Sequence, residues 1–223
     1  ILRRDHGYIG TLIDDLVTKG TEEPYRIMTS RSEYRLLHRQ DNADERLSEI
    51  AYHCGLISEE RITAVREKYA AVEREIRRLE GCGVGASEAL NDLLTGRGSA
   101  PVSSSARMLD LLRRPELDYD CLAPFDPGRE PLPLEVRRQV EIRVKYQGYL
   151  ARQEKQIAEF AKAETRLLPP DIDYHSIGGL RLEARQKLSE IRPHSIGQAS
   201  RISGVSPSDI GVLLIYLSNG GAV

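Results

Sequence analysis

The chain has 223 residues, of which 40% are hydrophobic and 30% charged, enough for one large or two small domains with a buried core. Its formal net charge of -2 excludes a general attraction to nucleic acid, so a polyanion would have to bind at a local basic patch. No apolar run approaches the roughly 18 residues needed to span a bilayer, and the first residues lack the apolar core of a signal peptide.

The chain begins at Ile1 and not with a methionine, and its first residues read as the middle of a longer polypeptide. We therefore expect a fragment. Residues 1–30 also resist an all-helical interpretation, because turn residues alternate there with short apolar runs, a pattern compatible with a strand.

The segment EPYRIMTSRSEYRLLHRQDNAD concentrates arginines in this mildly acidic chain. If the segment is helical, Arg31, Arg35 and Arg39 recur on one face, and none of them has an acidic residue three or four positions away. The counter-charge must then lie elsewhere in the fold, in solvent or on a ligand. The four arginines of the segment are Arg26, Arg31, Arg35 and Arg39.

Two interpretations explain these arginines. The planar guanidinium suits phosphate, and the rings of Tyr25 and Tyr34 can stack on bases, which together predict an anion-binding site for RNA. A plain solvated face explains the same residues, and so does internal pairing with acids. The acids considered for such pairing are Asp14, Asp15, Asp41 and Asp44.

Helices and loops alternate across the middle of the chain. A serine N-cap, acids in the first turn and apolar residues at 3-4 spacing predict a helix over 58–81. A Gly/Ser-rich connector at 81–104 holds a short helix, and a compact helix after it ends at Pro115. Beyond a proline-rich loop at 123–135, a long helix is predicted over roughly 134–166.

The C-terminal segment SIGQASRISGVSPSDIGVLLIYL predicts a helix, a glycine turn and a second helix that starts at Pro207. A DNA-reading helix-turn-helix would need basic residues on its second helix. This second helix has neither Lys nor Arg and is apolar on most sides, which favours burial or a protein interface. The residues predicted to contact a partner are Ile210, Leu213, Leu214 and Leu217.

No catalytic centre is evident in the sequence. The five histidines are scattered, without H-E-x-x-H spacing, and the glycines do not follow a G-x-G-x-x-G pattern. Cys54, Cys82 and Cys121 are odd in number and widely spaced, which disfavours a structural zinc site and favours a reduced, cytosolic compartment. We assign no catalytic, cofactor-binding or metal-binding residue within this chain.

Four motifs stand in a fixed order along the chain: GYIGTLIDDLVTKGTEEPYRIMTSRSEYRLLHRQDNADERL, KYQGYLARQ, LLPPDIDYHSIGGL and RPHSIGQASRISGVSPSDIGVLLIYL. Together they closely resemble the C-terminal part of the GidA/MnmG family. The resemblance covers nearly the whole chain and is weakest over residues 81–132. Because several long, separated motifs agree in order, we regard it as specific.

The resemblance implies that an N-terminal FAD-binding domain of Rossmann type precedes this region. It also implies a homodimer that works with an MnmE-type GTPase and uses FAD, NADH and methylene-tetrahydrofolate. The resemblance implies that the homodimer and the GTPase together install a carboxymethylaminomethyl or aminomethyl group at C5 of the tRNA wobble uridine. Arg26 and Arg35 match family positions implicated in tRNA handling. The family's redox cysteines lie in earlier segments, so the resemblance implies no redox role for the cysteines here.

We therefore expect a mainly α fold that ends in a small helical bundle, with a short irregular or β remnant of the FAD domain at its start. The expected domains are 1–30 as the tail of the FAD-binding domain, 31–132 as a first helical subdomain, and 133–223 as a long helix plus the C-terminal bundle. The expected function is binding of tRNA and of the GTPase, without catalysis by the fragment alone. The alternatives are an interaction module with structural arginines, or arginines that contact the FAD domain or the dimer mate.

Overall fold

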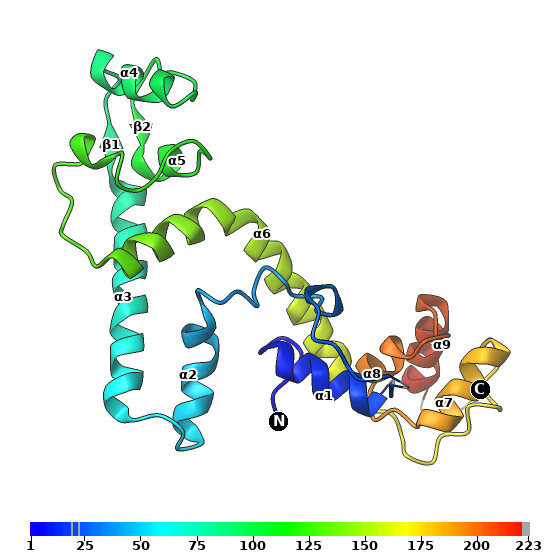
Figure 1. Ribbon diagram of the computed structural model, residues 1–223. Helices are drawn as coiled ribbons and strands as arrows, with labels where there is room; N and C mark the ends of the chain where they lie inside the picture. The colour runs from blue at the N-terminus through cyan, green and yellow to red at the C-terminus, as the bar shows by residue number, and fades with distance from the viewer. Residues whose placement is uncertain (19, 22, 220–223) are drawn as a thin grey trace. The chain divides into compact units, whose positions relative to one another are not determined.

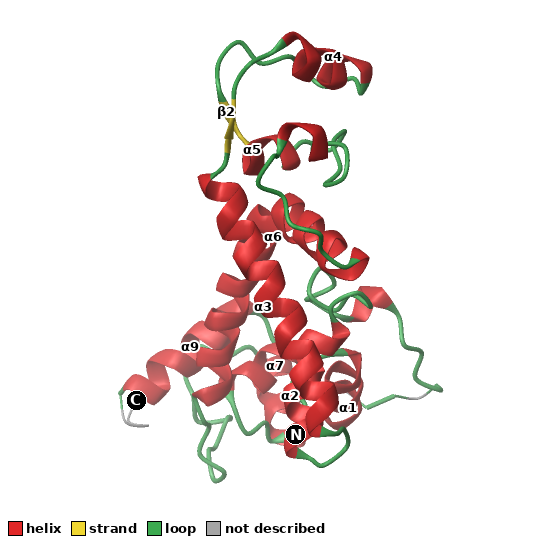
Figure 2. Cartoon of the chain, turned by 90° about the vertical axis from the view of Figure 1, so that its left-hand side faces the viewer, coloured by secondary structure: helices red, strands yellow, loops and turns green. Residues whose placement is uncertain are grey.

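The computed structural model describes residues 1–18, 20–21 and 23–219, except for the side chains of residues 156, 159, 160 and 164. Helices make up nearly all of the regular structure, accompanied by one small sheet (Figure 1 and Figure 2). The predicted mainly α fold is confirmed. The chain divides into two compact units, which we call the terminal unit (residues 1–38 and 152–223) and the central unit (residues 39–151).

The central unit begins with a helical hairpin of α2 (Ala43–His53) and α3 (Glu59–Gly81). Ser58 caps α3, because its Oγ accepts a hydrogen bond from the backbone N–H of Arg61 at 3.2 Å. The helix predicted over 58–81 is confirmed, and its apolar face is turned into the protein. The buried members of that face are Ile62, Val65, Tyr69, Val72 and Leu79.

A two-stranded antiparallel sheet follows α3. β1 (Gly83–Val84) pairs with β2 (Ala106–Arg107). The sequence does not predict these strands, because two residues are too few to show the alternation of a strand. The short helix expected in the connector is α4 (Glu88–Gly96), and the compact helix before Pro115 is α5 (Met108–Leu112). The 3-10 helix η2 (Ala123–Phe125) interrupts the proline-rich loop.

The long predicted helix is α6 (Leu134–Thr165), and the boundary between the two units falls within it. Its first turns supply Val136, Val140 and Val144 to the core of the central unit. Other fully buried side chains of this core include Val72, Leu90, Leu94, Met108, Leu111, Leu112 and Leu117.

The terminal unit starts with α1 (Tyr8–Thr18), which is followed by the 3-10 helix η1 (Thr29–Arg31). The strand considered for residues 1–30 is wrong for the described part of that range, which contains none. Gly10, whose position resembles a turn in the sequence, lies inside α1 instead. It permits a close approach of the chain, since a Cβ at this position would stand 2.0 Å from the backbone oxygen of Arg3.

The C-terminal bundle consists of α7 (Leu182–Ile191), α8 (Ile196–Arg201) and α9 (Pro207–Ser218). Gly204 turns the chain from α8 to α9 with a φ of 94°, and Glu183 occupies the space that a Cβ would fill. The predicted helix, glycine turn and helix are thus confirmed. The fully buried side chains of the bundle core include Tyr174, Ile177, Leu188, Ile196 and Leu213.

The capping signals act at the starts of α8 and α9. At α9, Ser206 and Asp209 form a complete capping box, in which each side chain accepts a hydrogen bond from the other's backbone N–H. At α8, Ser195 accepts from the backbone N–H of Gln198, but Gln198 accepts in return from His194.

Candidate nucleic-acid interface

The arginine-rich segment does not form the helix considered above. Beyond η1 its backbone follows turns and extended stretches, so the spacing of Arg31, Arg35 and Arg39 does not create a helix face. Ser32 contributes to this difference, because its Oγ accepts a hydrogen bond from the backbone N–H of Tyr34 at 3.2 Å. Such local side-chain bonds offer the backbone an alternative to helical pairing.

The segment is instead anchored to a buried arginine near the start of the chain. Arg4 is only 3% exposed, and its guanidinium contacts Asp14 at 2.9 Å, Asp15 at 2.8 Å and Glu33 at 2.7 Å. It also donates to the backbone oxygen of Arg31 at 3.4 Å. Burial lowers the pKa of Arg4, but its hydrogen bonds to Glu33 and Asp15 outweigh this effect and raise that pKa above its ordinary value. The guanidinium therefore ties α1 to the arginine-rich segment as a permanent cation.

A chain of contacts leads from this buried centre to the surface. Asp15 accepts a hydrogen bond at 2.7 Å from the hydroxyl of Tyr25, and the guanidinium of Arg31 lies 4.4 Å from the centre of the Tyr25 ring. Burial and the hydrogen bond to Asp15 raise the pKa of Tyr25. The ring thus holds the exposed Arg31 guanidinium by a cation–π contact.

His38 makes a second connection between the start of the chain and this segment. Its ring nitrogens contact Oγ of Ser32 at 2.9 Å and the backbone oxygen of Asp5 at 3.2 Å. The ring of Tyr8 meets the His38 ring edge-on with 5.2 Å between the ring centres, and the ring of Tyr34 does so at 6.3 Å. Tyr34 is itself buried, so it is a packing residue and not a surface for bases.

Three of the four predicted tRNA-contacting arginines belong to the terminal unit. Arg26, Arg31 and Arg35 are all exposed. Within residues 1–18, 20–21 and 23–219, no carboxylate forms an ion pair with Arg26 or Arg35. Because both side chains are exposed, their guanidinium groups are accessible from solvent. The predicted role of these arginines in tRNA binding stays a prediction.

The fourth arginine, Arg39, belongs to the central unit and is held by its neighbours. Its Nε lies 3.0 Å from Oδ1 of Asp41, and its guanidinium lies 6.0 Å from the ring centre of Tyr146. Burial raises the pKa of Asp41, but hydrogen bonds from Arg39 and Gln139 lower it below its ordinary value. Asp41 is one of the acids that the sequence suggested as an internal partner for the arginines. The contact between Arg39 and Asp41 agrees with that interpretation.

The four residues predicted to contact a partner differ in exposure. Leu213 is fully buried in the bundle core and is not accessible in this fold. Ile210, Leu214 and Leu217 pack against the same core and are half-buried. Ile215 is 62% exposed and was not predicted, because a helix that is apolar on most sides does not show which face is outward.

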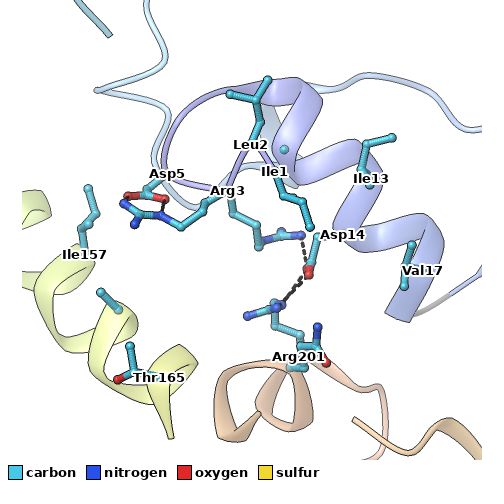
Figure 3. Close-up of a pocket in the computed structure, with 14 residues that line it drawn as sticks. Ile1, Leu2, Arg3, Asp5, Ile13, Asp14, Val17, Ile157, Thr165 and Arg201 are labelled. Carbon is cyan, nitrogen blue, oxygen red and sulfur yellow. Dashed lines mark hydrogen bonds and ion pairs between the residues drawn. The ribbon is translucent and has the colours of Figure 1, made fainter. Parts of the chain in front are cut away.

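Sequence reasoning did not predict the ion pairs by which Arg4 and Arg201 organise the site. Arg201 of α8 lies 2.8 Å from Asp14 of α1, the same carboxylate that contacts Arg4 (Figure 3). Beside this cluster lies a hollow of about 370 Å³, lined in part by Ile13 and Val17. No local pattern links these arginines to Asp14, since the partners are 10 and 187 positions apart.

The described residues contain no group of three or more His, Cys, Asp and Glu side chains suited to a metal ion. Among the same residues, no helix combines the length and apolar character required to cross a membrane.

Two family descriptions match the chain, and both define a helical region of a tRNA-modifying enzyme. Residues 59–154 match the tRNA modifying enzyme MnmG/GidA C-terminal helical domain, and residues 156–222 match the MnmG/GidA C-terminal helical bundle. The chain belongs to the MnmG/GidA family and corresponds to its C-terminal region.

Similar proteins agree over almost the whole chain. The tRNA uridine 5-carboxymethylaminomethyl modification enzyme MnmG of Lachnoclostridium phytofermentans is 54% identical, and that of Caldicellulosiruptor saccharolyticus is 55% identical. Each match covers 97% of this chain and 35% of the relative. A crystal structure of Aquifex aeolicus GidA (form II) is similar with a TM-score of 0.77 and 40% identity, over 97% of this chain and 33% of that one. The chain thus spans about a third of the length of these relatives.

Proposed function

We propose that this chain is the tRNA- and partner-binding region of an FAD-dependent enzyme. The enzyme would install the carboxymethylaminomethyl or aminomethyl group at C5 of the tRNA wobble uridine, together with an MnmE-type GTPase. The curated relatives support this proposal, since their name states the carboxymethylaminomethyl modification of tRNA uridine. The proposal places the enzyme in the cytoplasm as a homodimer.

The flavin belongs, in this proposal, to the part of the longer enzyme that precedes this region. The residues of this chain do not fit FAD, because no glycine-rich phosphate loop is present and Gly10, in the wall of the hollow, is covered by the backbone of Arg3. NADH and methylene-tetrahydrofolate would act as co-substrates at the same upstream part. We assign no catalytic residue to this chain.

The proposal of tRNA binding rests on one observation: exposed arginines belong to a segment that a buried arginine holds in place. Arg26, Arg31 and Arg35 project from a segment that the buried Arg4 fixes through Glu33. The Arg31 guanidinium is held over the Tyr25 ring, so it loses less conformational freedom when it forms paired hydrogen bonds with a phosphate. The segment is therefore suited to bind a phosphate backbone.

Salt dependence of tRNA binding by the full-length enzyme tests this proposal. Removing one arginine that binds a phosphate should reduce the slope of log K against log salt by about 1. We expect the combined change of Arg26, Arg31 and Arg35 to Gln to flatten the slope by up to about 3. The matched control is the combined change of three exposed arginines on α3 to Gln, which alters the net charge equally. These are Arg61, Arg74 and Arg77.

An unchanged slope in the first variant would remove these arginines from the RNA contact. The alternative, an interaction module with structural arginines, has one observation in its favour, the Arg39–Asp41 contact. It predicts that the combined change of Arg31, Arg35 and Arg39 to Gln lowers the melting temperature of the enzyme while its affinity for tRNA stays the same. The salt slope of tRNA binding and the melting temperature together distinguish RNA-binding arginines from structural ones.

The proposed GTPase contact uses α9. Because Leu213 is buried, the contact would rest on the half-buried Ile210, Leu214 and Leu217, with the exposed Ile215 beside them. Ile215→Lys is expected to weaken GTPase binding without unfolding the bundle, as measured by calorimetry and circular dichroism. Unchanged GTPase affinity in a folded Ile215→Lys variant would argue against this surface.

A further inference from the structure

Helix α1 is oriented with its polar side inward. Its buried side chains are Thr11, Asp15 and Thr18. Its exposed side carries four large apolar residues at the 3-4 spacing of one helix face. These are Ile9, Ile13, Leu16 and Val17, and Val17 is 75% exposed.

The inward polar side has a partner within this chain. Asp15 lies 2.8 Å from the guanidinium of Arg4 and accepts a hydrogen bond at 2.7 Å from the hydroxyl of Tyr25. Reversing the helix would leave the Arg4 guanidinium buried without this carboxylate, at a large electrostatic cost. The orientation of α1 is therefore set by its polar contacts, and they leave the apolar face without a cover among the described residues.

The apolar face extends into the hollow of about 370 Å³ (Figure 3). Ile13 and Val17 of α1 line it on one side and Ile157 of α6 on another. Ile1 and Leu2 also line it. In a longer polypeptide, the residues immediately before Ile1 would consequently leave from the edge of this hollow.

We infer that α1 is an interface helix whose apolar face is covered by the part of the longer enzyme that precedes Ile1, with an apolar side chain from that part in the hollow. This inference rests on the proposed function in one respect only: both assume that the chain is part of a longer enzyme. The matched regions are the C-terminal ones of relatives that are about three times as long, so the unmatched part of those relatives lies before this region.

A covalently connected segment is favoured over a second copy of the chain as the occupant. It begins at the rim of the hollow, so its effective concentration at this surface is high. Its position also gives α1 a defined role. One face of the helix holds the segment with the exposed arginines through Asp15 and Tyr25, while the other face holds the preceding part of the enzyme.

Cysteine labelling of the full-length enzyme tests whether the face is covered. Val17→Cys is compared with Leu182→Cys, because Leu182 at the start of α7 is similarly exposed at 70%. Each rate of thiol modification is read at its own peptide by mass spectrometry and normalised to the rate in urea. We expect the cysteine at position 17 to react about tenfold more slowly or slower still, because burial makes labelling depend on local opening. Equal rates would overturn the inference.

A photo-crosslinker at position 13 identifies the occupant. Equal amounts of isotopically light and heavy full-length enzyme are mixed, allowed to exchange subunits and irradiated. The inference predicts crosslinks within one chain to residues that precede Ile1. Crosslinks between light and heavy chains would assign the face to a second copy and would overturn it. Neither measurement involves tRNA, so this inference and the proposed tRNA contact can fail independently.

Discussion

Arg4 and Asp15 form a buried ion pair in which Nη1 and Oδ1 lie 2.8 Å apart and neither side chain is more than 5% exposed. Removing two charges from water is costly, and their attraction compensates only when further hydrogen bonds satisfy both groups. Asp14 and Glu33 contact the same guanidinium, and Tyr25 donates to the same carboxylate. This pair is therefore the centre from which α1 and the arginine-rich segment are positioned.

Replacing Arg4 by Met should destabilise the terminal unit strongly. The change removes one partner of the buried Arg4–Asp15 ion pair, and breaking such a pair typically costs about 3–5 kcal/mol. Hydrogen exchange of the α1 amides measures the loss. Arg3→Met is the matched control, because Arg3 is 59% exposed and its contact with Asp5 is a surface pair worth at most about 1 kcal/mol. Equal effects of the two changes would show that the buried pair does not organise the unit.

A methyl group at Gly10 should also destabilise the terminal unit. The new Cβ of Gly10→Ala would stand 2.0 Å from the backbone oxygen of Arg3, so the chain must move at a cost of about 1–3 kcal/mol or more. Gly148→Ala in α6 is the control. There, a Cβ meets no described atom within 4 Å, and the substitution should stabilise the helix by about 0.5–1 kcal/mol. Thermal unfolding of both variants checks the opposite signs, and a Gly10→Ala variant as stable as the wild type would contradict the close contact.

The capping box of α9 should make the bundle sensitive to acid. Hydrogen bonds from Arg181 hold the pKa of Asp209 well below its ordinary value, although burial opposes this shift. A carboxyl whose pKa is lower in the folded state stabilises the fold above its unfolded pKa of about 4, and the contribution is lost as the pH falls toward the folded value. Asp209→Asn should therefore cost about 1–2 kcal/mol at pH 7 and progressively less below about pH 4.

Urea unfolding at several pH values measures this difference. Asp171→Asn, at an exposed loop position of the same unit, is the control and should change stability little at any pH. A constant difference between wild type and Asp209→Asn from pH 7 to pH 2 would contradict a lowered pKa for Asp209.

Sequence patterns predicted the elements whose signals are local and missed those set by distant contacts. The cap and apolar spacing of α3, and Ser206 with Asp209 at α9, each lie within one or two turns of a helix. By contrast, Arg4 and Glu33 are 29 positions apart, so the buried cluster that shapes residues 1–38 leaves no periodic pattern. Helix α1 was not recognised although its apolar residues have helical spacing, because the turn residues between the short apolar runs of residues 1–30 favoured another interpretation.

The four arginines should contribute unequally to tRNA binding. Arg35 is exposed without an ion-pair partner among the described residues, whereas Arg39 contacts Asp41. Arg35→Gln in the full-length enzyme should reduce the salt slope of tRNA binding by about 1 and leave the melting temperature unchanged. Arg39→Gln should lower the melting temperature, because it leaves Asp41 without its cation, and should change the slope less. If Arg39→Gln reduced the salt slope more than Arg35→Gln does, the RNA contact would be assigned to Arg39.

Two substitutions of Tyr25 distinguish two roles of its side chain: the ring positions Arg31, and the hydroxyl stabilises the buried cluster. Tyr25→Phe keeps the ring beneath the Arg31 guanidinium but removes the hydrogen bond to Asp15, which should cost about 1.5–3 kcal/mol of stability because the acceptor is charged. Its affinity for tRNA should stay close to that of the wild type. Tyr25→Leu removes the hydrogen bond and the ring together, so it should show a similar loss of stability and also weaker tRNA binding. Unfolding in urea and tRNA titration of the full-length variants measure the two effects. If Phe and Leu at position 25 weaken tRNA binding equally, the Tyr25 ring does not position Arg31 for RNA.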